Sequence, residues 1–259
     1  MDYAEFQKEV HLSGKDICRE ILASNRQSIR VKKEDTVVKN LERIFSATLK
    51  ISNQKGFQAM SMRDLSRETR LSMGALYSYF TSKDELLAML QHQRRTITGR
   101  ILEEHIGRES EPAAKLRTAI LTHLYLSEAM QPWFYFSYME AKNLSAEEQA
   151  LAVASELYTE QIFSDILKQG QEKGCFSRRD AQLTASLIKA LVQDWYLKRR
   201  KYAKRNITVD QYGRFVLEFV EGFVINSSAD LRYYHPGQLT EDKDERYRSA
   251  RSSPQRRSH

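Results

Sequence analysis

Three serines most constrain what this chain can fold into. Ser61 and Ser82 are each followed three residues later by an acidic residue, so each can start a helix with a capping box. Ser72 lies between them and can cap a helix of its own. Three helix starts so close together leave room only for short helices joined by tight turns. Residues 35–90 are therefore expected to form a compact three-helix unit.

The composition narrows the fold class to helices. The chain has 259 residues, of which 41% are apolar and 29% charged, and this balance is sufficient for a folded core. It contains only ten glycines and four prolines, whereas chains rich in strands and turns need more of both. Together with apolar residues at helical spacing, this scarcity predicts an all-α fold.

The sequence shows no pattern typical of export, membrane insertion or metal binding. Its first residues lack a basic start followed by an apolar run, and no stretch approaches the roughly 18 apolar residues of a membrane span. The two cysteines, Cys18 and Cys175, fit neither a disulfide framework nor a metal-binding spacing. We therefore expect a cytoplasmic protein with no membrane partner, no metal and no cofactor.

Positive charge is concentrated in the first part of the chain. Residues 1–100 carry 18 basic and 12 acidic side chains, residues 101–228 carry 16 and 17, and residues 229–259 carry 7 and 5. A basic first part joined to a near-neutral body is typical of a nucleic-acid-binding surface attached to a sensing domain, because phosphate contacts need Lys and Arg. Solubility alone would produce the same excess, so local motifs must decide.

Four regions are predicted along the chain. Residues 1–34 are expected to be a weakly ordered N-terminal extension, and residues 35–90 form the three-helix unit. Residues 91–228 carry amphipathic helices, among them one from Asp180 to about Arg205 and a final one with a wide aromatic stripe. Residues 229–259 are rich in Arg and poor in apolar residues, which predicts a flexible basic tail.

One motif is specific enough to suggest a family. Gly74-Ala-Leu-Tyr-Ser-Tyr-Phe80, followed by Ser82-Lys-Asp-Glu-Leu-Leu87, resembles the helix-turn-helix signature of the tetracycline-repressor (TetR) family of bacterial transcriptional regulators. The resemblance covers residues 36–90. It implies an N-terminal three-helix DNA-binding domain followed by a C-terminal helical ligand-binding and dimerisation domain. Arg70 departs from the family pattern, which usually has glycine in this turn, so either the turn is rebuilt or a strained positive φ is tolerated.

The resemblance makes the helix after Ser72 the recognition helix, which enters the major groove of DNA. Its outward residues are small or apolar and suit thymine methyl groups, so DNA shape and Arg63 on the preceding helix are expected to contribute more than usual. Tyr77, Tyr79 and Lys83 resemble the family's phosphate-binding residues. A helix-turn-helix that serves only packing is the alternative. The predicted DNA contacts are Arg63, Ser72, Met73, Gly74, Ala75, Tyr77, Ser78, Tyr79 and Lys83.

The last two predicted helices carry more apolar surface than one narrow seam needs. In the family these helices pair across a twofold axis, which implies a homodimer whose two recognition helices read the halves of a palindromic operator in double-stranded DNA. Packing within one subunit is the alternative for the aromatic stripe. The predicted dimer contacts are Leu187, Leu191, Phe215, Phe219 and Phe223.

Aromatic side chains are dense between residues 121 and 139. By itself such a stretch is somewhat more typical of ordinary core, but family members generally bind a small hydrophobic effector here and release DNA. The basic run 198–205 is similar to the fatty-acid-responsive branch, which implies acyl-CoA as an effector class; complementation of a helix dipole is the alternative. The predicted effector contacts are Leu121, Leu124, Tyr125, Trp133, Phe134, Phe136, Tyr138, Phe163, Trp195 and Arg199.

Two other function classes compete with a ligand-responsive repressor. An acyl-CoA-binding enzyme would need a catalytic constellation, yet the six histidines are scattered and the sequence has no HExxH, no GxSxG and no phosphate-binding glycine loop. His123 and Glu140 are the remaining candidates for such chemistry. A helical partner-binding protein without operator binding is the second class. The sequence therefore predicts a regulator that is not an enzyme and leaves its operator and effector open.

Overall fold

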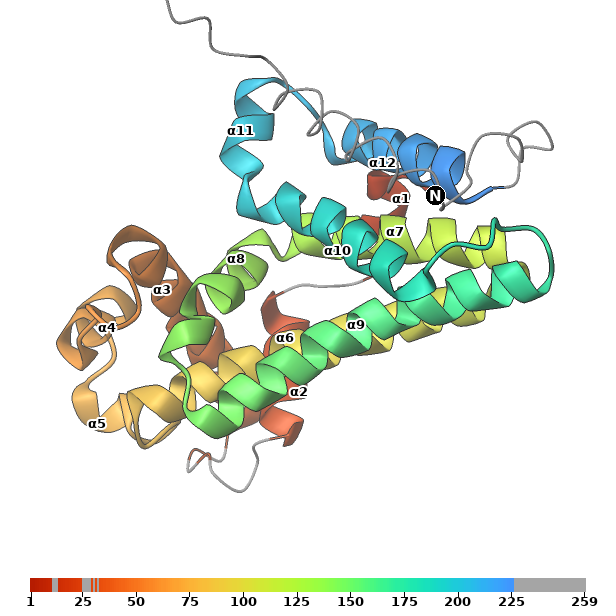
Figure 1. The fold of residues 1–259 in the computed structure, drawn as a ribbon. Helices are drawn as coiled ribbons and strands as arrows, with labels where there is room; N and C mark the ends of the chain where they lie inside the picture. The colour runs from red at the N-terminus through yellow and green to blue at the C-terminus, as the bar shows by residue number, and fades with distance from the viewer. Residues whose placement is uncertain (11–13, 25–28, 30, 32, 226–259) are drawn as a thin grey trace, which may run out of the picture. The chain divides into compact units, whose positions relative to one another are not determined.

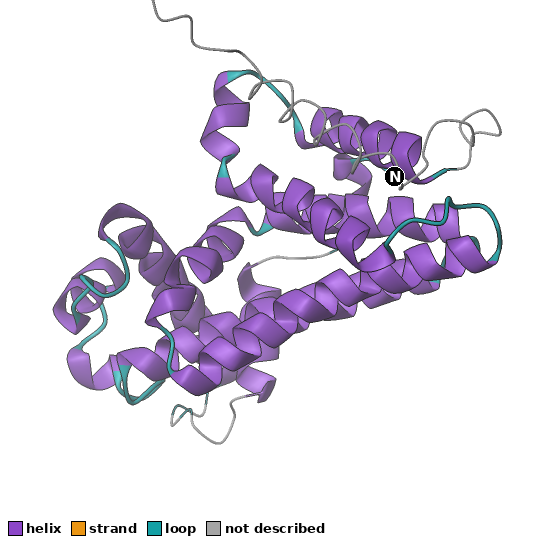
Figure 2. Ribbon diagram, viewed as in Figure 1, coloured by secondary structure: helices purple, strands orange, loops and turns teal. Residues whose placement is uncertain are grey.

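The computed structural model describes the chain except residues 11–13, 25–28, 30, 32 and 226–259, so the predicted tail lies outside the described residues. The predicted all-α fold is confirmed (Figure 1, Figure 2). Across the described residues, no helix has the length and apolar character needed to span a bilayer. In chain order the elements are α1 (Tyr3–Glu9), α2 (Gly14–Ser24), α3 (Glu34–Lys55), α4 (Met62–Thr69), α5 (Met73–Leu76), α6 (Lys83–Gly107), α7 (Pro112–Ala129), α8 (Gln131–Glu140), the 3-10 helix η1 (Ala141–Asn143), α9 (Ala146–Glu172), α10 (Ala181–Leu197), α11 (Arg199–Lys204) and α12 (Val209–Val224).

The predicted three-helix unit consists of α3, α4 and α5, and Ser82 starts the long helix α6 that follows it. Ser61, Ser72 and Ser82 each accept a hydrogen bond from the backbone N–H three residues ahead, at 3.1 Å in all three caps. Leu65 of α4 and Leu76 of α5 are fully buried, and α4 packs on both α3 and α5. The serine caps therefore start the helices where the sequence predicts, and the buried leucines hold them together.

The turn between α4 and α5 is strained at Arg70. This residue has φ 54° and ψ 30°, the left-handed conformation that favours glycine. The side chain of Arg43 on α3 donates a hydrogen bond to the Thr69 carbonyl beside the turn. The tight turn is thus kept and the strain tolerated, because the packing of α4 and α5 over-determines the backbone.

We expect the substitution Arg70→Gly to stabilise the protein by about 1 kcal/mol, because glycine adopts this conformation without a Cβ clash. The free energy of unfolding from urea denaturation measures the effect. Arg70→Ala is the matched control: it also removes the charge but keeps the Cβ, so it should bring no gain. Equal stability of the two variants would contradict backbone strain at this turn.

Two helices, α1 and α2, lie within the N-terminal extension for which the sequence predicts weak order. Phe6 of α1 is fully buried, with its ring centroid 5.6 Å from that of Tyr125 and 5.7 Å from that of His105. The Tyr3 backbone N–H donates to Asp210 Oδ1 at 2.9 Å. The second helix, α2, packs on α3 and buries its own apolar face. A seven-residue helix is too short to show a clear helical periodicity. The residues on which it packs also lie far away in the sequence, so no local pattern indicates this contact.

The helix predicted from Asp180 to about Arg205 is in fact two helices, α10 and α11. They meet at Lys198, whose backbone leaves the helical conformation at φ −114° and ψ 29°. Asp194 forms ion pairs at 2.7 Å with both Lys198 and Lys201. Trp195 stacks on Tyr202 with 5.1 Å between ring centroids. These side-chain contacts turn the chain where the sequence pattern alone continues as a helix.

The long helix α6 joins the three-helix unit to the body of the molecule. It packs on α7, α8 and α9, while α7, α9 and α10 pack on one another (Figure 1). Gly170 in α9 is required here, because a Cβ at this position would overlap the ring of Phe176. The helix α6 therefore connects the three-helix unit, which contains α5, to the packed helices of the body, which include α10.

Candidate DNA-binding surface and effector region

The helix α5 presents a small, open face. Gly74 is exposed, and a Cβ built there would meet no atom within 4 Å. Tyr77 is 42% exposed, Met73 and Ala75 are half-buried, and Leu76 points into the core. The face offers apolar groups and one phenolic hydroxyl to a partner, which is the surface that the sequence predicts for a recognition helix.

Tyr79 lies inside the molecule, which corrects its prediction as a phosphate contact. Its side chain is 1% exposed, and its hydroxyl accepts a hydrogen bond from Asn40 Nδ2 at 2.8 Å. Tyr77 and Tyr79 are two residues apart in a turn that follows α5, so they point in different directions. The sequence predicts a helix after Ser72 but does not indicate that this helix ends at Leu76.

Lys83 at the start of α6 uses most of its hydrogen-bonding capacity within the protein. Its Nζ donates to the carbonyl oxygens of Phe57 at 3.0 Å and Gln58 at 3.2 Å, and it lies 4.9 Å from the centroid of the Phe57 ring. Burial lowers the pKa of Lys83. Because an ammonium has three N–H donors, at most one is left for a phosphate. Lys83 therefore acts first as a tie between α6 and the loop before α4.

Polar groups around α5 differ in how much they can offer to DNA. Arg63 on α4 and Arg70 in the turn are exposed. Ser78 is half-buried and donates its hydroxyl to the Ala75 carbonyl at 2.6 Å, which leaves only its oxygen as an acceptor. Ser72 is exposed and accepts the capping bond, so its hydroxyl hydrogen is available. Cations from α4 and its turn therefore border the α5 face.

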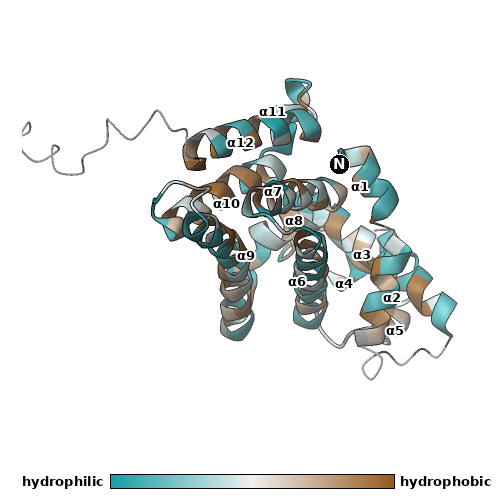
Figure 3. Ribbon diagram, turned by 90° about the vertical axis from the view of Figure 1, so that its right-hand side faces the viewer, coloured by the Kyte–Doolittle hydropathy of each residue, from teal (hydrophilic) through white to brown (hydrophobic). Residues whose placement is uncertain are grey.

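Two rows of exposed apolar side chains lie on the neighbouring helices α10 and α12. On α12, Phe215 is 69% exposed and Phe219 is 62% exposed, and Phe223 continues the row one turn later. Apolar and polar residues alternate along this helix (Figure 3). On α10 the row consists of Leu187 and Leu183, whereas Leu191 is half-buried. Leu183 is not among the dimer contacts predicted from the sequence. Its spacing of four residues from Leu187 places both on one face of the helix and would have indicated it.

The side chains predicted as effector contacts lie in different parts of the molecule. Tyr125 lies beneath α1, and its hydroxyl donates to Asp210 Oδ1 at 2.8 Å. Phe136 packs edge-on against Phe57 of the three-helix unit at 5.7 Å between centroids, and Tyr138 is exposed. Tyr125, Phe136 and Tyr138 thus have separate surroundings, and a common aromatic pocket for an effector stays a prediction.

Trp195 and Arg199 both donate hydrogen bonds to Glu128. This contact does not support the predicted role of Arg199 in binding the effector. Arg199 donates from Nε and Nη2 to the two oxygens of Glu128 at 2.8 and 2.9 Å. Trp195 Nε1 donates to the same carboxylate at 3.0 Å. The charge of Arg199 is thus already balanced by a bidentate ion pair. Glu128 lies about seventy residues away in sequence, and no local pattern connects the two.

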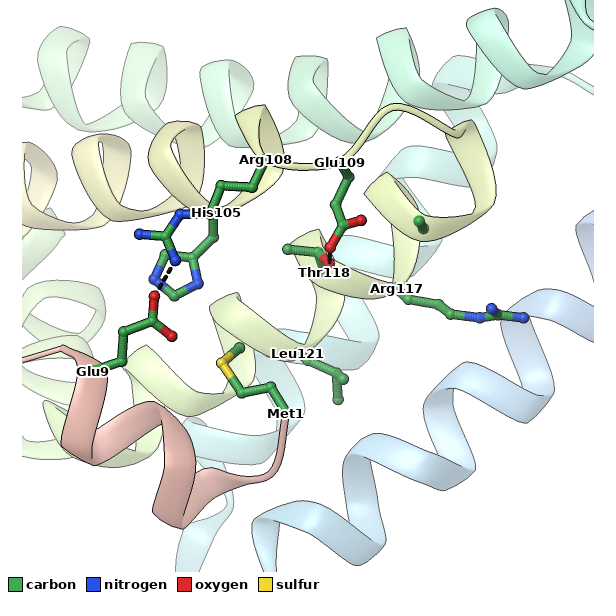
Figure 4. Close-up of a pocket in the computed structure, with 9 residues that line it drawn as sticks. Met1, Glu9, His105, Arg108, Glu109, Arg117, Thr118 and Leu121 are labelled. Atoms are coloured by element: carbon green, nitrogen blue, oxygen red, sulfur yellow. Dashed lines mark hydrogen bonds and ion pairs between the residues drawn. The ribbon is translucent and has the colours of Figure 1, made fainter.

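A cavity of about 390 Å³ opens between α1, α6 and α7. Figure 4 shows its charged lining, in which Arg108 reaches Glu9 and Glu109 reaches Thr118. Of the predicted effector contacts, only Leu121 lines it. A second cavity of about 380 Å³ is bordered by Trp133, while Leu124, Phe134 and Phe163 are buried in the core.

A buried carboxylate joins the body to the three-helix unit. Glu140 at the end of α8 accepts a hydrogen bond from the Phe57 backbone N–H at 3.0 Å, and Gln91 of α6 donates to the Ser137 carbonyl of α8 at 3.1 Å. Sequence reasoning considered Glu140 only for catalysis and missed this link. Among the described His, Cys, Asp and Glu side chains, no group of three could hold a metal ion.

Comparisons with known proteins agree with this architecture. Residues 44–90 match the family model "Bacterial regulatory proteins, tetR family", and residues 109–220 match the model "Tetracyclin repressor-like, C-terminal domain". The transcriptional regulator PksA of Bacillus subtilis is 26% identical over 209 residues, which cover 76% of this chain and 96% of PksA.

Solved structures share the fold. The ketosteroid transcriptional regulator KstR2 of Mycobacterium tuberculosis superposes with a TM-score of 0.65 at 18% identity, over 77% of this chain and 98% of KstR2. AibR in complex with isovaleryl coenzyme A and operator DNA gives a TM-score of 0.60 at 17% identity, over 70% of this chain and 95% of AibR. With two family models matched in the expected order and an open helix-turn-helix, the chain belongs to the TetR family and is a DNA-binding transcriptional regulator.

Proposed function

We propose that the protein is a cytoplasmic homodimeric repressor that binds a palindromic operator and is released by a small effector, which it binds without turning it over. One observation carries this proposal: the α5 face is open, while apolar rows on α10 and α12 of the same chain are uncovered. An open recognition helix and an uncovered apolar face are the two surfaces that a twofold DNA-binding protein requires.

The apolar rows support self-association. Monomeric proteins rarely leave large contiguous apolar patches exposed, and the four side chains Leu183, Leu187, Phe215 and Phe219 are each more than half exposed. Pairing α10 and α12 with their copies would cover both rows. It would also set two α5 helices at a fixed separation, and half-sites one helical turn apart require roughly 34–36 Å.

The effector class is inferred from similarity in fold. AibR, which shares the fold, was solved with isovaleryl coenzyme A and operator DNA, and this supports acyl-CoA thioesters as candidate effectors here. Mass spectrometry of small molecules extracted from the purified protein tests this class directly. Recovery of an acyl-CoA would support it, and recovery of an unrelated compound in stoichiometric amount would contradict it.

The contacts around Phe57 provide a route from effector to DNA. Glu140 and Phe136 of α8 contact Phe57, and Lys83 of α6 contacts the same residue. An effector that favours a different position of α6 or α8 would move the three-helix unit as a body. This movement changes the separation of the two α5 helices, so effector and operator would compete through one conformational equilibrium.

A band shift with the DNA upstream of the protein's own coding region tests operator binding. We expect retention of that fragment at low salt, and release when the extracted effector is added. A DNA fragment of the same length and scrambled sequence is the control. Equal retention of both fragments would contradict sequence-specific binding.

The two tyrosines of the motif allow a sharper test. Tyr77→Phe removes an exposed hydroxyl, so it should leave stability unchanged and weaken operator binding by roughly tenfold or more, the value of a hydrogen bond to a charged phosphate. Tyr79→Phe removes the acceptor of the Asn40 amide and should lower the free energy of unfolding by about 1 kcal/mol with little change in DNA affinity. Band shifts and urea denaturation distinguish the two, and the reverse assignment would contradict the site.

A further inference from the structure

Three basic side chains lie on α6, α7 and α10, and α7 packs on both of the other two helices. Lys189 of α10 and His123 of α7 are 6% and 1% exposed, and Lys189 Nζ lies 3.2 Å from His123 Nε2. Arg94 of α6 lies over the ring of Phe134 at 5.5 Å, and His123 packs on the edge of the same ring at 5.8 Å. Phe134 thus has a cation on one side and the imidazole on another.

The protonation states follow from these contacts. Burial, with further effects of Lys189 and Arg94, lowers the pKa of His123 well below its ordinary value, so the ring is neutral. Burial lowers the pKa of Lys189 to about 8, so this ammonium is mostly charged at pH 7. Lys189 therefore donates to His123 Nε2, which places the imidazole hydrogen on Nδ1. Arginine keeps its charge in proteins.

Of the described carboxylates that act on this cluster, only Glu156 lies within ion-pair distance of Lys189, while Glu160 acts on Lys189 from farther away. Among the described residues, Glu156 is the carboxylate that pairs with Lys189, at 3.8 Å, and its side chain is 46% exposed. No ion pair within 4 Å joins Arg94 to a described carboxylate, and Arg94 Nε and His123 Nδ1 are buried without a hydrogen-bond partner in that part of the chain. Buried charges are normally paired and buried donors normally satisfied.

We propose that Arg94, Lys189 and His123 form the seat for an anionic group of the effector, a carboxylate or a phosphate. Guanidinium and ammonium groups bind such oxygens with charge-assisted hydrogen bonds, and the unpaired His123 N–H is a third donor. The rings of Phe134 and Tyr196 are 5.2 Å apart between centroids. In this proposal they contact the apolar part of the effector. The effector is then an amphiphile with one anionic end, and this inference rests on the proposed effector response.

Calorimetric titration of the full-length protein without DNA tests the seat with three probes that share one chain length: decanoate, decanoyl-CoA and decan-1-ol. Binding of either anion, with the alcohol much weaker, supports the proposal. Decanoate alone would identify a free acid as the source of the anionic group, and decanoyl-CoA alone would identify the thioester. Binding of the alcohol as tightly as the anions, or of neither anion, would overturn the seat.

The variants Arg94→Met and Lys189→Met locate the site. Each should weaken binding of the anion by roughly 10- to 150-fold, the range for hydrogen bonds to charged groups, whereas Lys168→Met, at an exposed position on α9, should change nothing. Without ligand, Arg94→Met should unfold at the same or a higher urea concentration, because a half-buried guanidinium without an ion pair is removed. Unchanged anion affinity in Arg94→Met, or a lower stability of that variant, would overturn the assignment.

A band shift with the same probes separates this inference from the proposed function. Anion binding that depends on Arg94 and also releases the operator supports both. Anion binding that depends on Arg94 but leaves the operator complex intact upholds the seat and overturns the proposed release.

Discussion

Phe219→Asp is expected to produce a folded monomer that binds the operator at least about 100-fold more weakly than the native protein. Phe219 is 62% exposed within one chain, so the fold should tolerate a carboxylate there. In a dimer, the same position would bury that charge against a second copy, and an unpaired buried charge is costly. Loss of the dimer also removes the gain in affinity that comes from binding two half-sites at once. In linked systems this gain is roughly 10²- to 10⁴-fold.

Sedimentation measures the oligomeric state. Band shifts with a full palindrome and with a single half-site measure the affinity for DNA. The monomer should bind both DNAs with similar weak affinity. Arg214→Asp is the matched control, because it places a carboxylate on an exposed position of α12 that is not in line with Phe215, Phe219 and Phe223. A Phe219→Asp protein that still sediments as a dimer would refute the interface.

Phe6→Ala should lower the free energy of unfolding by about 3–5 kcal/mol, the usual cost of removing a buried phenylalanine side chain. Phe6 is fully buried between Tyr125 and His105, and it is the apolar anchor of α1. Once α1 loses that anchor, the bond from the Tyr3 backbone to Asp210 should also weaken. The extension would then leave α7 and expose Tyr125.

Urea denaturation gives the stability loss, and hydrogen exchange of the α1 amides shows whether that helix detaches. Lys8→Ala is the control, since it changes an exposed side chain on the same helix. If the amides of α1 exchange as fast in the native protein as in Phe6→Ala, the extension is the weakly ordered appendage that its sequence suggests, and the packing described for it is wrong.

The candidate site could be predicted in part. The motif around Gly74 identified the open face of α5, and the row of phenylalanines on α12 identified an uncovered apolar surface. Tyr79 was misassigned because it lies in the turn after Leu76, where helical spacing no longer gives the direction of a side chain. Arg199 was misassigned because its partner, Glu128, is distant in sequence. The sequence drew no attention to Arg94 or Lys189, since isolated basic residues in amphipathic helices normally face water.

The sequence by itself determined the helical class, the starts of the helices at Ser61, Ser72 and Ser82, and the family, because capping and periodicity act between residues a few positions apart. Only the tertiary structure decided that α1 is anchored on α7, that the long C-terminal helix breaks at Lys198, and that Arg94 and His123 lie against Phe134. Each of these depends on pairing between residues far apart in the chain. Such pairing is set by packing and charge balance in three dimensions, which no local pattern records.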